Sequence, residues 1–245
     1  MNNISEYQVF ELTGNKKTKS GDQVEKWITP QIADMQKKMQ QWDWSKPFEL
    51  EMPDKPIATQ FDDVLKKNGL PDKLPELVKV FLYSSSKLTD FIKGSFLEQY
   101  GLIVSTKAKV VLEQFNIGKH KFYPIILNQK NIDYDDYYFF KSLTNANEYI
   151  DIKKSSFYLQ DGYFNKDTKR PVTFASYEEI ETFRLKNTGN NIYIFAEKIF
   201  LNENFPDYDY FTINEFGIND IFISPNLADG LKMLTGINLK NIKAF

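Results

Sequence analysis

The sequence contains no cysteine, and this absence excludes disulfides, thiolate zinc sites and cysteine nucleophiles. It contains a single histidine, so a transition-metal site would lack its usual ligands. Only two of its 31 basic residues are arginines, Arg170 and Arg184, and its formal net charge is −2. A general nucleic-acid-binding protein carries a positive excess and relies on arginine for bidentate contacts. We therefore expect no nucleic-acid partner.

Long apolar runs are also missing. No run approaches the ~18 residues needed to cross a bilayer. Residues 1–6 show neither the basic nor the apolar region of an export signal. We therefore expect no membrane association and a cytoplasmic location. The chain has 245 residues, of which 42% are hydrophobic and 26% charged, and this is enough for one large or two small folded domains.

The apolar pattern predicts an α+β protein, with a mixed or antiparallel sheet and helices packed mainly to one side. The strands that the pattern predicts cover residues 6–12, 102–104, 120–127, 137–143, 148–152, 157–159, 182–185 and 192–200. Two helices are predicted to begin after Thr29 and after Ser105, and two further helices to cover residues 61–67 and 75–83. Residues 188–191 predict a hairpin turn between the last two of these strands.

Two segments of the chain share a weak pattern. Asp90–Ile117 can be laid over Asp209–Gly236 without a gap, at an offset of 119 residues. Only three pairs are identical, but in each unit a strand is followed by a serine, Ser105 or Ser224, that caps an amphipathic helix. Each helix is then followed by another strand, at residues 120–127 and 242–245. No glycine-rich loop precedes either helix. We therefore expect the serine side chains to accept hydrogen bonds from the free backbone amides at the helix starts, and we expect no bound anion there.

The residues of nucleophilic catalysis are scarce. His120 is the only histidine, and it lies between Lys119 and Lys121. Two neighbouring cations disfavour the imidazolium that a Ser-His-Asp triad must stabilise, and no Gly-x-Ser-x-Gly motif occurs. We therefore expect His120 at the surface or at a strand edge, and we expect no catalytic residue, no cofactor and no metal.

Two stretches interleave aspartate with tyrosine. Their residues are Asp133, Tyr134, Asp135, Asp136, Asp207, Tyr208 and Asp209. One interpretation is a carboxylate pair for general acid–base work. A second is a partner-binding surface, because tyrosine supplies contact area and carboxylates steer association. A third is a solvated turn with its tyrosines packed inward. We predict the second, with a basic, recessed surface on the partner.

Several short motifs resemble a bacterial immunity-protein family of polymorphic toxin loci, first described from a myxobacterial protein. The motifs are LIVS at 102–105, KVVLE at 109–113, FYP at 122–124, YYFF at 137–140, IDIKKS at 150–155, and the segments 223–236 and 244–245. The sequence departs from the family pattern at Phe140 and Lys141, where an aliphatic residue and an asparagine are usual. It also has Gly236 but not the second glycine of the terminal motif.

The resemblance spans residues 90–245 and is loose over residues 1–89. It implies a non-enzymatic protein that binds and neutralises a cognate toxin in the producing cell, and it supplies no catalytic residue. We expect residues 1–89 to form an N-terminal α/β-containing region and residues 90–245 an immunity-protein-like α+β domain, packed together as one unit. The oligomeric state is left open.

Two other functions stay open at this point. One is a carboxylate-dependent hydrolase that uses an acidic pair such as Asp135 with Asp209. The other is a non-enzymatic adaptor encoded in a secretion-linked locus, which would bind a partner without protecting the cell.

Overall fold

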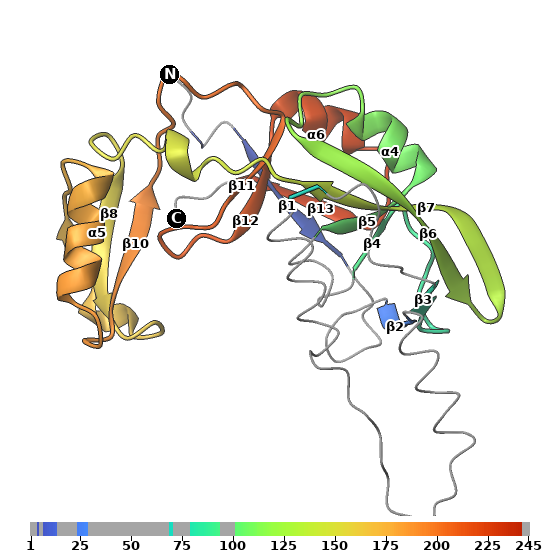
Figure 1. Cartoon of the computed structure of the whole chain (residues 1–245), viewed down its shortest axis with the longest axis horizontal. Helices are drawn as coiled ribbons and strands as arrows, with labels where there is room; N and C mark the ends of the chain where they lie inside the picture. Colours follow the sequence, from blue (N-terminus) through green and yellow to red (C-terminus); the bar gives the residue numbers. More distant parts are fainter. Residues whose placement is uncertain are drawn as a thin grey trace, which may run out of the picture.

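The computed structural model describes residues 4, 7–13, 24–28, 69–70, 79–93 and 101–241. It confirms the α+β class, and it distributes the described strands over three sheets rather than one (Figure 1).

The largest sheet has six strands in the order β2-β3-β6-β7-β5-β4. Their bounds are β2 (Val24–Ile28), β3 (Lys79–Leu82), β4 (Phe91–Ile92), β5 (Leu102–Ser105), β6 (His120–Gln129) and β7 (Ile132–Ser142). Only the β3–β6 pair is parallel. Lys130 and Asn131 turn the chain between β6 and β7 with φ of 51° and 64°, the left-handed conformation that a two-residue hairpin turn requires. The hairpin projects at one end of the molecule (Figure 1).

The second sheet has four strands in the order β11-β12-β1-β13. Their bounds are β1 (Gln8–Leu12), β11 (Tyr210–Ile213), β12 (Asp220–Ile223) and β13 (Ile237–Asn241). β1 comes from the start of the chain, yet it lies between β12 and β13 and is antiparallel to both.

The third sheet has three antiparallel strands in the order β10-β8-β9, and helix α5 covers one of its faces (Figure 1). Their bounds are β8 (Ser156–Asp161), β9 (Arg170–Val172), β10 (Ile192–Lys198) and α5 (Tyr177–Lys186). Two short 3-10 helices, η2 (Asn147–Tyr149) and η3 (Lys166–Thr168), lie in the connections. Ile180 of α5 is fully buried and belongs to a core cluster that includes Phe157 and Ile194.

Helices α4 (Thr106–Leu112) and α6 (Pro225–Leu231) lie side by side (Figure 1). Glycine permits this close approach, because a Cβ on Gly230 of α6 would lie 3.0 Å from the ring of Phe115, just after α4. One core cluster joins both helices to the six-stranded and four-stranded sheets. In this cluster, Phe10 of β1 contacts Phe91 of β4 with ring centroids 5.2 Å apart.

The two units predicted at an offset of 119 residues are present. Each runs strand, strand, serine-capped helix and strand: β4-β5-α4-β6 and β11-β12-α6-β13. Ser105 accepts a hydrogen bond from the backbone N–H of Ala108, and Ser224 accepts one from Leu227, both at 3.1 Å. The sheet order β4-β5-β7-β6 corresponds to β11-β12-β1-β13. The N-terminal strand β1 therefore occupies in the second unit the place that β7 occupies in the first, so the second unit is circularly permuted.

Four local predictions were wrong. Residues 79–82 are strand rather than helix, because they pair in parallel with Leu127 and Asn128 of β6. Residues 182–185 belong to α5, which is capped by Ser176. The segment 148–152 contains part of η2 and, at Ile150, a single bridge to Leu201 rather than a strand. The turn at 188–191 consequently joins a helix to a strand.

Other local predictions fall outside the described residues. They are the helix after Thr29, the helix at 61–67 and the strand at 242–245.

Candidate functional site

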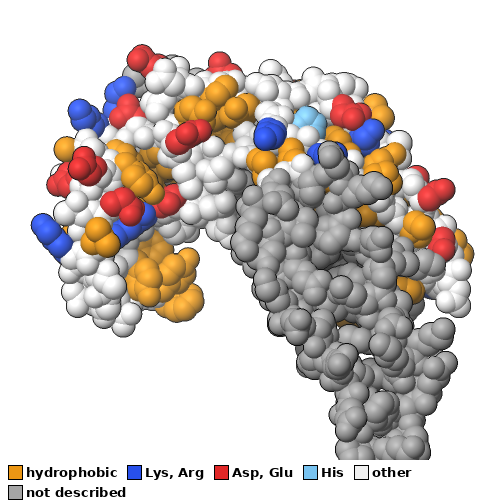
Figure 2. Space-filling model, in the orientation of Figure 1, with side chains coloured by type: hydrophobic (Ala, Val, Ile, Leu, Met, Phe, Trp, Pro, Cys, Tyr) orange, Lys and Arg blue, Asp and Glu red, His pale blue; other side chains and the backbone are white. Residues whose placement is uncertain are grey.

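The first acidic stretch lies on β7, next to the turn of the projecting hairpin. Asp135 and Asp136 are exposed, and neither forms an ion pair with a residue that the structure describes. Asp133 is exposed and accepts a hydrogen bond from Asn128 of β6. Tyr134 is half-buried and packs against the core cluster of the six-stranded sheet. Figure 2 shows acidic side chains along this end of the molecule.

The second acidic stretch is built into the structure. Asp209 accepts hydrogen bonds from the hydroxyl of Ser224 at 2.5 Å and from the backbone N–H of Asn116 at 2.8 Å. Tyr208 is half-buried, with its ring centroid 5.6 Å from that of Phe205. Asp207 is exposed and has a φ of 48°. The side chains of Tyr208 and Asp209 thus make structural contacts, whereas the carboxylates of Asp135 and Asp136 form no hydrogen bond or ion pair with a described residue.

The structure does not bring the two acidic stretches together. Thr106, at the start of α4, donates a hydrogen bond to the backbone carbonyl of Asp136. Asn116, beyond the end of α4, contacts Asp209. The seven residues of α4 span about 10 Å. Asp135 and Asp209 therefore lie beyond opposite ends of this helix, too far apart for one carboxylate pair. The partner-binding role of both stretches stays a prediction.

His120 begins β6, as expected for a residue at a strand edge. Its side chain is half-buried, Nδ1 lies 2.9 Å from the carbonyl oxygen of Gly118, and the ring packs against Phe122 at 5.5 Å between centroids. These contacts give the ring a packing role in the sheet.

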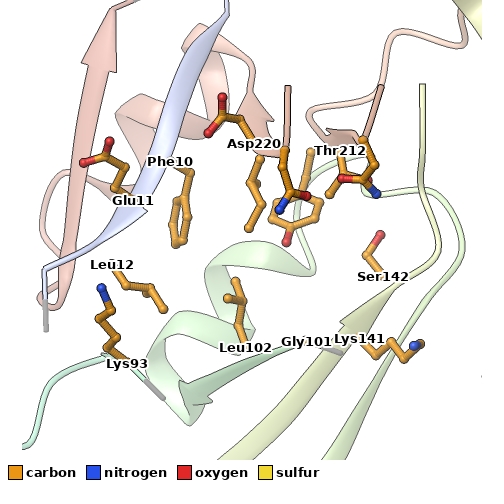
Figure 3. Close-up of a pocket in the computed structure, with 14 residues that line it drawn as sticks. Phe10, Glu11, Leu12, Lys93, Gly101, Leu102, Lys141, Ser142, Thr212 and Asp220 are labelled. Carbon is orange, nitrogen blue, oxygen red and sulfur yellow. The ribbon is translucent and has the colours of Figure 1, made fainter. Parts of the chain in front are cut away.

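A pocket of about 590 Å³ opens between the six-stranded and four-stranded sheets (Figure 3). Phe10, Leu12 and Leu102 supply apolar lining from the two sheets. The side chain of Tyr210 also lines it, is 5% exposed and donates no hydrogen bond to a residue that the structure describes. Burial raises the pKa of this phenol.

Two carboxylates, those of Glu11 and Asp220, lie at the rim of this pocket. Burial and the charge of Glu11 raise the pKa of the Asp220 carboxyl. Glu11 is paired with Lys240 at 2.6 Å. In Figure 3 both carboxylates point away from Leu102 on the opposite wall. Sequence reasoning missed this pair, because its members are 209 residues apart and no local motif joins them.

A second feature that sequence reasoning missed is an aromatic face on the three-stranded sheet. We define the aromatic face as Tyr158, Tyr163, Phe164, Tyr193 and Phe195. Its strand residues alternate with buried ones, so it lies opposite the face that α5 covers. The alternation predicts a strand that is apolar on both faces, and only the fold shows that no described helix covers one of these faces.

None of the helices in the described part of the chain is long and apolar enough to cross a bilayer. The described ranges likewise contain no group of three or more histidine and acidic side chains that could hold a metal ion.

A model of the immunity protein family Imm11 matches residues 15–203, which is about three quarters of the chain. The chain belongs to the Imm11 immunity protein family. This confirms the resemblance inferred from the motifs between residues 102 and 155. No curated protein matches the chain.

The bounds of the Imm11 match bear on the candidate residues. The match includes the projecting hairpin and the whole aromatic face, and it ends before Asp207–Asp209. It also extends into residues 15–89, where the motif resemblance was loose.

Proposed function

We propose that this Imm11 chain is an immunity protein that binds a cognate toxin in a stoichiometric complex, in the cytoplasm of the producing cell, and so neutralises it. Family membership is the observation that carries the proposal. The exposed carboxylates of Asp135 and Asp136 support it: they form no ion pair with a described residue, and such charges steer association with a basic surface. In this proposal the protein acts by blocking a surface of the toxin and not by catalysis.

The test uses the product of the neighbouring open reading frame as the toxin. Co-expression with this chain should restore growth, and a catalytically inactivated toxin should co-purify with it in a fixed ratio. The proposal would be contradicted if co-expression did not restore growth and no complex co-purified. A complex without rescue would instead support the adaptor that the sequence left open.

A carboxylate-dependent hydrolase is the second candidate. The pocket between the two sheets favours it, because the carboxylates of Glu11 and Asp220 both line this pocket and burial raises the pKa of Asp220. Rescue without a stable complex would support this candidate. Asp220→Asn separates the two, because it keeps the size of the side chain and removes its acid–base chemistry. Under the binding proposal, Asp220→Asn protects cells as well as the unaltered chain does.

A further inference from the structure

The aromatic face exposes rings that no described helix or strand covers. Phe164 is 90% exposed, Tyr163 49% and Tyr193 38%. Tyr163 joins them, because its ring centroid lies 5.1 Å from that of Phe164 and 5.5 Å from that of Tyr193. Figure 2 shows a hydrophobic patch on the lobe that this sheet forms. Contiguous exposed apolar side chains of this kind mark interaction surfaces in proteins.

Two strand rings of the aromatic face pack against each other, and one of them packs against a glycine. Phe195 is stacked with Tyr158 at a centroid distance of 5.4 Å and an interplanar angle of 13°. The ring of Phe195 lies directly on Gly217, where a Cβ would be 2.1 Å from it. No larger residue fits at Gly217, so glycine at this position permits the close packing of the Phe195 ring against the backbone.

The turn that carries Tyr163 and Phe164 is also braced. Gln160 is 2% exposed, and its amide nitrogen donates to the carbonyl oxygens of Gly162 and Tyr163 at 2.9 and 2.7 Å. Arg170 makes two hydrogen bonds to the carboxylate of Asp161, at 2.8 and 2.9 Å. A surface that is already ordered loses little entropy on binding, so its apolar area contributes more fully to affinity.

The charges beside the aromatic face indicate the chemistry of its partner. Lys169 lies over the ring of Tyr158, with Nζ 4.2 Å from the centroid, and Lys166 lies on the same loop. Neither lysine forms an ion pair with a described residue. Arg170 neutralises Asp161, so Asp167 is the one remaining negative charge of residues 161–170. The loop thus presents an excess of positive charge next to the rings.

We infer that the aromatic face is the docking surface for the toxin, with Phe164 entering an apolar recess whose edge carries carboxylates that face Lys169. The inference rests on the proposed function and assigns it a surface. It places the affinity at the end of the molecule opposite the acidic hairpin (Figure 1). Aromatic anchors at the centre of an interface carry most of its binding energy.

The test measures binding of the full chain to the catalytically inactivated toxin by titration calorimetry. Phe164→Ala should raise Kd by about 30-fold or more, as for a central anchor. The ring contacts only Tyr163 among the ring pairs of this face, so the substitution should leave thermal unfolding unchanged. Lys169→Glu should also raise Kd, and the increase should be larger at low salt, where charge repulsion is less screened.

Met233→Ala is the matched control, because Met233 is 82% exposed and lies just beyond α6, away from the aromatic face. Asp135→Lys tests the acidic hairpin in the same assay. A Kd unchanged by Phe164→Ala, or a loss confined to Asp135→Lys, overturns the inference and leaves the proposed function standing. Self-association that Phe164→Ala abolishes, with toxin binding intact, also overturns it and assigns the face to a second copy of the chain. If the unaltered chain binds no toxin, the proposed function fails first and the inference with it.

Discussion

At the scale of single residues, two aspartates join the two related units by hydrogen bonds. Asp90 accepts a hydrogen bond from Ser105 in its own unit at 2.9 Å and one from the backbone N–H of Thr235 in the other unit at 2.8 Å. Asp209 does the same with Ser224 and with Asn116, which is the counterpart of Thr235. Each aspartate therefore orients the serine that caps a helix and joins that helix to the opposite unit.

This arrangement predicts an acid-dependent loss of stability. Burial would raise the pKa of Asp90, but hydrogen bonds from Thr235 and Ser105 and the charge of Lys107 outweigh it and lower the pKa below the ordinary value. A lowered pKa in the folded state adds stability above the pKa of the unfolded chain, about 3.9, and this is lost as the pH falls through the folded pKa. Urea unfolding between pH 5 and pH 3 should show a shallower decline for Asp90→Asn than for the unaltered chain. Equal slopes would contradict the assignment.

At the scale of elements, the serine caps are the local signals that predict helix starts correctly. They place the starts of α4 and α6, because a cap depends only on a side chain and an amide three residues later. Helix α5 has the same signal, since the Ser176 hydroxyl accepts from the N–H of Glu179, but the β-branched and aromatic residues that follow favoured a strand. Strand β3 has no such local signal, because its pairing partner β6 lies about 45 residues further along the chain.

Removal of either cap should therefore have the same effect. Ser105→Ala and Ser224→Ala should each lower the free energy of unfolding by about 1–2 kcal/mol, because each loses a cap and leaves an aspartate oxygen unpaired. Chemical denaturation at pH 7 measures both. Ser176→Ala serves as the comparison, because the structure gives its hydroxyl no aspartate partner and the expected loss is about 1 kcal/mol. A smaller loss at Ser105 than at Ser176 would argue against the aspartate contacts.

The candidate site shows the same limit of local patterns. Aspartates alternating with tyrosines predicted one acidic surface, and sequence cannot show that α4 separates the two stretches. The aromatic face is harder still, because Tyr193 and Phe195 alternate with the buried Ile194 and Ala196 and so predict burial on both sides. Which face of the sheet α5 covers is decided by packing between elements, and a pattern within one strand does not show it.

At the scale of the whole molecule, the two units share one core through two equivalent ring contacts. Phe10 of β1 contacts Phe91 of the first unit, and Phe140 of β7 contacts Tyr210 of the second, with centroids 5.2 and 5.4 Å apart. Strands from the first 89 residues thus pair with strands of both units. The division of the chain between residues 89 and 90 stays a prediction.

Because these rings are equivalent, truncating either one should destabilise the whole chain. Phe10→Ala and Phe140→Ala should each lower the free energy of unfolding by about 3–5 kcal/mol, the usual cost of a cavity left by a buried phenylalanine. Unfolding in urea, followed by fluorescence and by circular dichroism, should show one coincident transition for each variant. Two separate transitions after Phe10→Ala would mean that the units unfold independently.

The central position of β1 also constrains how the chain is made. This strand precedes the other described strands, and β12 and β13, which flank it, are translated more than 200 residues later. At about 5–20 residues per second, β1 waits at least ten seconds for both neighbours. Closure of this sheet therefore waits until β13 has been translated, and it is a step of high contact order. A chain cut short before residue 237 lacks β13 and therefore cannot form the complete four-stranded sheet.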